Sequence, residues 1–187
     1  MADLDEHKLW ISQSQNGNHA AFAELIRVHQ PMIHTLTYRM TGSVADSQDL
    51  AQETFIRAYQ QLDAFNGASK FSSWLYRIAV NACIDWRRRE TRRAQLGAQW
   101  AEESLADRQG TPTAGEAPDD LSREVQSALM KLPAKQRAAI VLTVYGGHNH
   151  AEAAKILGCS EITVSWRIFS ARRKLKKLLA KVGGCYE

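Results

Sequence analysis

The residues best suited to contact a polyanion lie close together near the C-terminal end of the chain. Hydroxyl groups come first, at Ser160 and Thr163. The cations follow at Arg167, Arg172, Arg173, Lys174, Lys176 and Lys177. Arginine forms bidentate hydrogen bonds with base edges and phosphates, and hydroxyl groups donate to phosphates. The pattern favours nucleic-acid binding over the alternative, a basic helix face that is merely solvated.

Apolar spacing places these residues on a helix that starts at Ser160, a good N-cap residue. Its apolar positions are four and three residues apart, at Val164, Ile168, Ala171, Leu175 and Leu178. A shorter helical pattern precedes it, and Gly158 between the two permits the backbone angles of a tight turn. A short helix, a tight turn and a longer basic helix predict a helix-turn-helix, a motif whose second helix enters the major groove.

A second group of polar and aromatic residues lies between residues 65 and 89. A loop with Asn66 and Lys70 leads into a helix that carries Trp74, Arg77, Asn81 and Asp85, followed by Arg87, Arg88 and Arg89. Aromatic rings beside arginines suit stacking on unpaired bases. The same residues also fit a core aromatic cluster with cations near a helix C-terminus. The residues alone leave both interpretations open.

Acidic residues recur on one side of the helix between them. Asp46, Asp49 and Glu53 are three and four residues apart, with Gln52 beside them. A solvated acidic face explains this spacing better than a docking face for a basic partner.

Residue types typical of metal sites and enzymes form no recognisable pattern in the sequence. His148, His150 and Cys159 have no standard zinc spacing and lack a fourth ligand. No nucleophile or nucleotide-binding signature occurs. We therefore expect no metal, no cofactor, no small-molecule substrate and no enzymatic activity.

Charge is unevenly distributed along the 187 residues. The formal net charge is +1 for residues 1–93, −5 for residues 94–124 and +8 for residues 125–187. The three cysteines are far apart and include no CxxC pair, which favours a reducing compartment. The sequence shows neither a signal peptide nor an apolar run long enough to insert into a membrane. These features predict a soluble cytoplasmic protein.

The chain shows helical periodicity throughout and no strand alternation. We predict an all-α fold of two small helical domains, residues 1–93 and 121–187, joined by a flexible acidic linker over residues 94–120. The expected helices are residues 4–16, 19–41, 45–64, 71–93, 121–132, 134–145 and the two of the helix-turn-helix. Within them, Pro31 should kink a helix or mark its boundary. Leu50, Phe55, Ile56 and Tyr59 should face inward.

Three stretches together resemble a known family. They are DSQDLAQETFIRAYQQLDAF at 46–65, FSSWLYRIAVNACIDWRRR at 71–89, and LPAKQRAAIVL at 132–142 followed by the helix-turn-helix. In order and separation they are similar to the σ2 and σ4 domains of bacterial extracytoplasmic-function (ECF) sigma factors, proteins of the sigma-70 superfamily. Residues 22–93 resemble σ2 and residues 121–180 resemble σ4.

The resemblance implies three binding surfaces. One would dock on core RNA polymerase through Asp49, Leu50, Gln52, Glu53 and Phe55. A second would open and hold the −10 element of promoter DNA through Phe65, Asn66, Lys70, Trp74, Arg77, Asn81, Arg87 and Arg88, with Trp74 supporting the surface. A third would read the −35 element through Ser160, Glu161, Thr163, Ser165, Trp166, Arg167, Ser170, Arg172 and Arg173. The resemblance also implies an anti-sigma factor as a regulatory partner.

The sequence departs from the family pattern at three positions of the −35 helix. Ser165 stands where the family usually has a basic residue, Trp166 where it often has serine, and Ser170 where it often has arginine. Two alternatives to a sigma factor are a stand-alone helix-turn-helix regulator that binds DNA without polymerase, and an adaptor that sequesters a sigma-factor inhibitor. The basic C-terminal part disfavours the adaptor.

Overall fold

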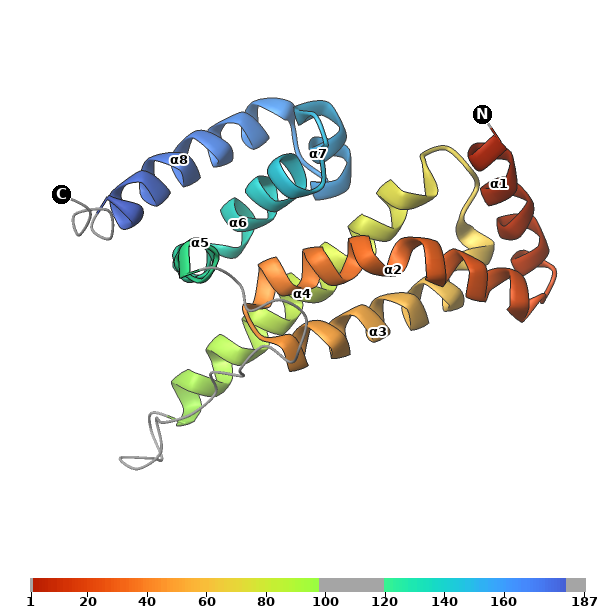
Figure 1. Cartoon of the computed structure of the whole chain (residues 1–187), viewed down its shortest axis with the longest axis horizontal. Coiled ribbons are helices and arrows are strands. Elements are labelled where there is room, and N and C mark those ends of the chain that lie inside the picture. The colour runs from red at the N-terminus through yellow and green to blue at the C-terminus, as the bar shows by residue number, and fades with distance from the viewer. Residues whose placement is uncertain (1, 98–119, 181–187) are drawn as a thin grey trace.

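The computed structural model describes residues 2–97 and 120–180, and every regular element in these two ranges is a helix (Figure 1). In chain order they are α1 (Ala2–Gln15), α2 (His19–Thr41), α3 (Val44–Gln60), η1 (Leu62–Ala64), α4 (Phe71–Gly97), α5 (Asp120–Met130), α6 (Ala134–Ile140), η2 (Val141–Tyr145), α7 (His150–Leu157) and α8 (Glu161–Leu179). The all-α prediction is confirmed.

Local capping sets the first helix boundaries. The Asn18 side chain accepts hydrogen bonds from the amides of Ala20 and Ala21, and α2 starts there. It ends at Gly42, whose φ of 75° lies in the left-handed region that favours glycine. The Ser43 side chain then caps α3 through the Asp46 amide. Pro31 marks no boundary, because α2 continues through it to Thr41.

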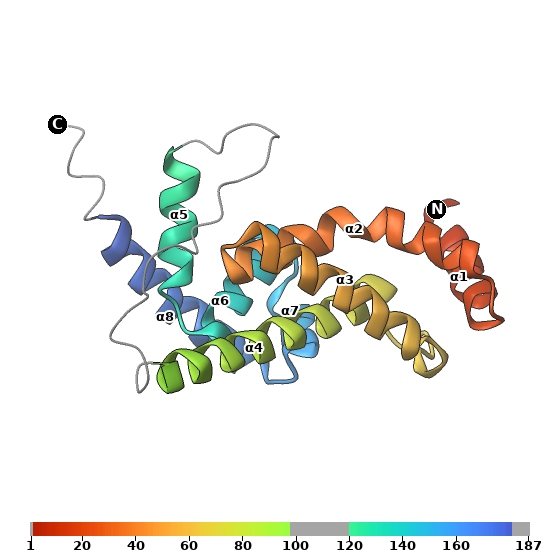
Figure 2. The same cartoon turned by 90° about the horizontal axis from the view of Figure 1, so that it is seen from below.

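Helices α2, α3 and α4 form the first bundle, and α1 packs along α2 (Figures 1 and 2). Their apolar stripes supply its core, which includes Leu25, Ile33, Leu36, Leu50, Leu75 and Ala79. Helix α4 extends four residues past the expected end at residue 93, to Gly97. The first four residues of the expected linker are therefore helical. Residues 98–119 of that linker, and Cys185 in the C-terminal tail, lie outside the described residues.

Helices α5 to α8 form the second bundle, with Leu129, Leu142, Val164 and Ile168 in its core. The helix expected over residues 134–145 is present, but its final turn, η2, has π-helical geometry. Its Gly146 amide reaches back to the carbonyl of Val141 at 3.0 Å, and the His148 amide bonds the carbonyl of Leu142.

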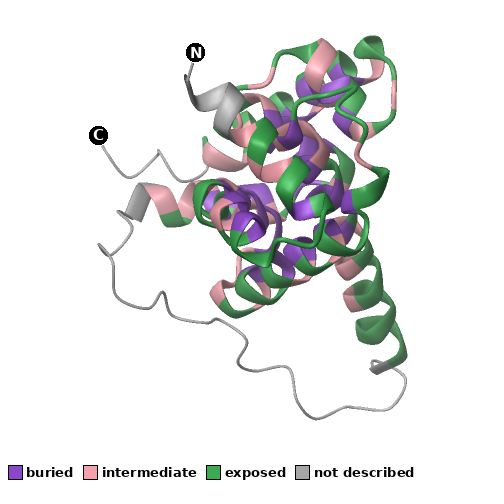
Figure 3. Ribbon diagram, turned by 90° about the vertical axis from the view of Figure 1, so that its right-hand side faces the viewer, coloured by how far each residue is buried: buried purple, intermediate pink, exposed green. Residues whose placement is uncertain are grey.

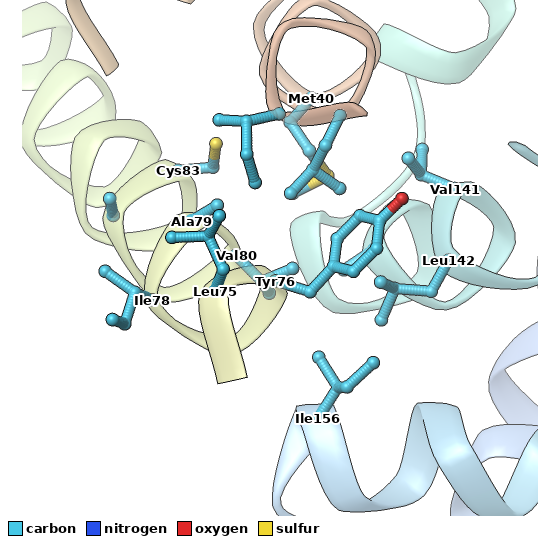
Figure 4. Close-up of a cluster of buried hydrophobic side chains, with 14 of the residues drawn as sticks. Met40, Leu75, Tyr76, Ile78, Ala79, Val80, Cys83, Val141, Leu142 and Ile156 are labelled. Carbon is cyan, nitrogen blue, oxygen red and sulfur yellow. The ribbon is translucent and has the colours of Figure 1, made fainter. Parts of the chain in front are cut away.

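The two bundles are packed against each other. Tyr76 of α4 points toward Val141 and Leu142 of η2, with Met40 of α2 and Ile156 of α7 around it (Figure 4). The buried residues form one cluster that includes members of both bundles, and Figure 3 shows buried segments through the middle of the molecule. The sequence predicted two tethered domains but no contact between them.

Arg137 of α6 lies at this junction with only 1% of its surface exposed. Its guanidinium donates to the backbone carbonyls of Leu129, Met130 and Leu132, at 2.7 to 3.0 Å, and to that of Met40 in α2. Burial lowers the pKa of Arg137 to about 10, so the group keeps its charge at neutral pH. One side chain thus joins the end of α5 to the end of α2 by charge-assisted hydrogen bonds.

Candidate nucleic-acid and partner interfaces

The helix-turn-helix is defined by three local signals. Asn149 and Glu152 form a reciprocal capping box at the start of α7. Gly158 ends α7 with a φ of 59°, a left-handed conformation that costs a side-chain-bearing residue energy. Ser160 caps α8 by accepting from the Thr163 amide at 3.2 Å. The predicted turn and N-cap are both present.

Packing fixes which face of α8 is available. Val164, Ile168 and Ala171 are buried, and α8 packs against α6 and α7. The opposite face is open to solvent in the structure. Six of the predicted −35 residues are exposed, namely Ser160, Glu161, Ser165, Trp166, Arg172 and Arg173.

Three hydrogen bonds join predicted −35 residues of α8 to other residues of the second bundle. Ser165 Oγ lies 2.9 Å from His150 Nδ1, and Ser170 Oγ accepts from Gln136 Nε2 at 3.2 Å. Arg167 Nη1 donates to Cys159 Sγ at 3.4 Å. The half-buried Thr163 lies 2.9 Å, oxygen to oxygen, from Ser160. In this arrangement Arg167 is directed toward the turn, not outward from α8.

The predicted −10 residues lie in the loop before α4 and along α4 as far as Arg88. Phe65 and Trp74 pack with Phe71 in an aromatic cluster, with ring centroids 5.2 to 5.5 Å apart. Asn66 Oδ1 accepts from the Ala68 amide and shapes the loop. The remaining predicted residues Lys70, Arg77, Asn81 and Arg88 are exposed, and Arg87 is half-buried. The structure therefore gives the aromatic residues a packing role and leaves polar groups at the surface.

Helix α7 lies against this surface. A cavity of about 290 Å³ is lined by Lys70, Trp74 and Arg77 on one side and by Glu152, Lys155 and Ile156 on the other. Beside it, Tyr76 meets His148 edge to face with ring centroids 4.7 Å apart. The sequence carried no signal for this contact, because residues about 70 to 85 positions apart meet only in the tertiary structure.

Helix α3 presents the predicted polymerase-binding residues on different sides. Asp49 and Gln52 are exposed, and the half-buried Glu53 forms an ion pair with Arg57. Leu50, by contrast, is 2% exposed and Phe55 is 9% exposed. Leu50 therefore belongs to the core that positions α3.

An apolar groove of about 650 Å³ runs between α2 and α3. Gln52 and Phe55 line it, together with Phe22, Ile26, Gln30, His34, Gln48, Ala51, Ile56, Tyr59 and Gln60. The prediction that Ile56 and Tyr59 face inward is wrong: they are 50% and 39% exposed. Leu50, Ala51 and Phe55 form the buried stripe of α3. Ile56 and Tyr59 lie outside that stripe and are exposed to solvent.

Residues 2–97 and 120–180 contain no group of three or more His, Cys, Asp or Glu that could hold a metal ion. Burial raises the pKa of the Cys83 thiol to about 12, which leaves it protonated and a poor nucleophile. Within the same residues, no helix is both long enough and apolar enough to cross a membrane.

Two family models match the chain in separate segments. Residues 25–93 match the model described as Sigma-70 region 2, and residues 122–175 match that of Sigma-70, region 4. The ECF RNA polymerase sigma factor SigW of Bacillus subtilis is 38% identical over 176 residues, which cover 90% of this chain and 94% of SigW. SigM of Mycobacterium tuberculosis (strain H37Rv) is 35% identical over 166 residues, covering 87% of this chain and 79% of SigM. The chain belongs to the family of ECF RNA polymerase sigma factors.

Solved sigma-factor structures share the fold. The sigma factor RpoE of Bartonella quintana, in complex with the anti-sigma factor NepR, has a TM-score of 0.68 and 28% identity, covering 85% of this chain and 96% of RpoE. CnrH, in complex with the cytosolic domain of CnrY, has a TM-score of 0.68 and 30% identity, covering 94% of this chain and 98% of CnrH. Region 2 of this sigma factor spans most of α2 through α4, and region 4 spans α5 through most of α8.

Proposed function

We propose that this chain binds core RNA polymerase and directs it to promoters, with residues 1–93 as a σ2 domain, residues 94–120 as a connector and residues 121–187 as a σ4 domain. It supplies sequence recognition and strand opening, while polymerase carries out the chemistry. The observation that carries the proposal is the presence of both sigma-70 regions, in order, in one chain that resembles SigW over nearly its whole length.

Core polymerase docks on α3 in this proposal. The exposed Asp49 and Gln52 supply polar contacts, and the groove between α2 and α3 accepts apolar side chains of the partner. Unlike a fully solvated acidic face, α3 offers an apolar groove next to its exposed acid. Apolar burial and charge complementarity are therefore both available to a basic helical partner.

Promoter DNA contacts the two other surfaces. The exposed Asn66, Lys70, Arg77 and Asn81 hold the −10 element, and Phe65, Phe71 and Trp74 keep the loop and the start of α4 in place. Helix α8 enters the major groove at the −35 element, and Arg172 and Arg173 contact phosphates there. The opening energy comes from binding exposed bases, since unstacking costs a few kcal/mol per base.

Run-off transcription with purified core polymerase tests the proposal. Core polymerase plus the chain should initiate at specific genomic promoters, and core polymerase alone should not. Asp49→Arg should weaken core binding about tenfold or more by size-exclusion co-elution, because it reverses a charge on the docking face. Asp63→Arg is the matched control, since Asp63 is an exposed acid in η1 outside that face. Operator binding without any affinity for core polymerase would instead indicate a stand-alone regulator.

Salt dependence tests the placement of α8. Replacing Arg172 and Arg173 together by alanine should weaken −35 binding by the polymerase-bound chain and reduce the slope of log affinity against log salt by about 0.9 per lost phosphate contact. Arg27→Ala removes an exposed cation from α2 and should leave that slope unchanged. An unaltered slope in the double variant would contradict the assigned face.

An anti-sigma factor completes the proposed set of partners. In two similar solved structures, RpoE is bound to the anti-sigma factor NepR and CnrH is bound to the cytosolic domain of CnrY. We therefore expect a protein inhibitor that competes with core polymerase for this chain. Affinity purification of the chain from its host, with and without added core polymerase, would identify the inhibitor by its displacement.

A further inference from the structure

Helix α8 carries an exposed apolar stripe on the side opposite its core face. Ile162, Trp166 and Phe169 are 82%, 63% and 66% exposed. They are four and three residues apart, so they line one face of the helix. The buried Val164, Ile168 and Ala171 occupy the other side. Single exposed apolar residues are ordinary on protein surfaces, but three in one stripe indicate a contact surface.

Three of the polar groups next to the stripe are engaged within the second bundle. Ser165 pairs with His150, Ser170 with Gln136, and Arg167 donates to Cys159. The N-terminal half of α8, which in a helix-turn-helix approaches base edges, therefore presents the apolar stripe outward, beside the exposed Glu161 and Ser165. Arg167 and Ser170, in particular, are held by contacts within the bundle and are not positioned for hydrogen bonding to base edges.

We propose that this chain reads its −35 element largely through apolar contact of Trp166, Phe169 and Ile162 with the C5-methyl groups of thymines. The inference rests on the proposed entry of α8 into the major groove. Thymine is the one unmodified base that presents a methyl group there, and apolar side chains are its natural contacts. A thymine-bearing −35 element is therefore the predicted ligand.

Charge identifies duplex DNA as the occupant of the stripe. The last two turns of α8 expose Arg172, Arg173, Lys174, Lys176 and Lys177. A major groove combines methyl groups on its floor with phosphates on its rims, and so matches an apolar stripe that continues into a cationic one. A protein partner on the same stripe is the alternative that the experiment must separate.

Uracil substitution isolates the methyl groups, because deoxyuridine differs from thymidine only by their absence. Duplexes of about 40 base pairs with a randomised −35 region are selected by the polymerase-bound chain. The selected duplex is then resynthesised in two forms. One carries deoxyuridine in place of thymidine within the −35 region, and the other carries it only outside that region. The transfer value of one buried methyl(ene) corresponds to about fourfold in affinity. We expect that loss per contacted thymine within the −35 region and no loss outside it, by fluorescence anisotropy.

Variants of the stripe then test whether its side chains cause the preference for thymine over uracil. Trp166→Ala should bring the thymine-to-uracil affinity ratio close to one, and Phe169→Ala should reduce it. Leu9→Ala is the matched control, since Leu9 is 55% exposed on α1, away from α8, and it should keep the wild-type ratio. Thermal melts followed by circular dichroism check that the variants fold. Because Trp166 is largely exposed, its replacement should leave the fold intact.

The possible results distinguish a failure of this inference from a failure of the proposed function. If the unaltered chain binds the thymine and uracil duplexes with equal affinity, the inference that it reads thymine methyl groups is wrong. Binding of the chain to the −35 element is not contradicted by that result. Failure of the polymerase-bound chain to enrich any −35 sequence overturns the proposed function itself. If Trp166→Ala keeps the wild-type ratio but abolishes binding to a protein partner, the stripe is a protein-docking surface and the inference is wrong.

Discussion

His148 and Tyr76 meet edge to face where the second bundle covers α4. Burial lowers the pKa of the imidazole, and Lys70 lowers it further, whereas Glu152 raises it. The net shift is downward, so the packed arrangement favours the neutral ring. Protonation of His148 therefore opposes this contact.

The sign of this shift predicts a loss of stability in mild acid. Because the folded pKa lies below the unfolded value, the stabilisation is present above about pH 6.5 and is lost as pH falls toward the folded pKa. Between pH 7.5 and 5.5 the free energy of unfolding should therefore fall by the part that His148 contributes. Urea unfolding at both pH values measures it. The pKa of Glu152 is itself lowered, chiefly by its hydrogen bond from the Asn149 amide, so Glu152 stays ionised over this range.

His148→Gln is the variant that isolates the effect. It removes the titrating ring, so the drop between the two pH values should shrink by the part that His148 contributes. An unchanged drop in the variant would assign the pH dependence to other histidines.

At the scale of elements, the junction between α2 and α3 also positions α5. Gly42 ends α2 with a positive φ, and a Cβ built there would lie 2.9 Å from Met130 Sδ of α5. Close by, Gln126 of α5 donates to the Tyr38 carbonyl at 3.2 Å and accepts from Arg39. One glycine thus serves both as a helix cap and as a point of close approach.

Gly42→Ala should lower the free energy of unfolding by about 1–3 kcal/mol, because it strains the backbone and displaces Met130. Gly67→Ala is the matched control: Gly67 has nearly the same φ, 74°, but no atom within 4 Å of a built Cβ. It should cost only the backbone strain, about 1 kcal/mol. Denaturant titration of both variants gives the difference, and equal losses would show that the contact with α5 adds nothing to stability.

At the scale of the whole molecule, the two bundles share one core. Tyr76, the buried Arg137 and the Gly42 junction all connect them. In this arrangement α7 stands over part of the proposed −10 surface. Use of that surface by promoter DNA therefore requires α7 to move away from α4.

The free chain should accordingly unfold as one cooperative unit. Differential scanning calorimetry should give a single transition with a calorimetric enthalpy equal to the van't Hoff enthalpy. Two resolved transitions would instead describe independent domains on a tether. The calorimetric scan must use the chain without partners, because any ligand of the folded state would shift the transition.

Short-range patterns in the sequence were sufficient to predict the helices. Apolar spacing placed Val164, Ile168 and Ala171 on the buried side of α8, and Ser160 and Gly158 marked its start and the turn before it. The three motifs also pointed to the sigma-factor family. Each of these signals is local, so neighbouring residues determine it whatever the rest of the chain does.

Contacts between distant residues were decided only in the tertiary structure. Periodicity could not distinguish the buried Phe55 from the exposed Ile56 and Tyr59, because the width of the buried stripe depends on what packs against α3. Nor could it show that Arg167 is directed toward Cys159, or that Arg137 donates to a carbonyl 97 positions away. Such contacts depend on how helices meet across the shared core, and sequence separation carries no information about that geometry.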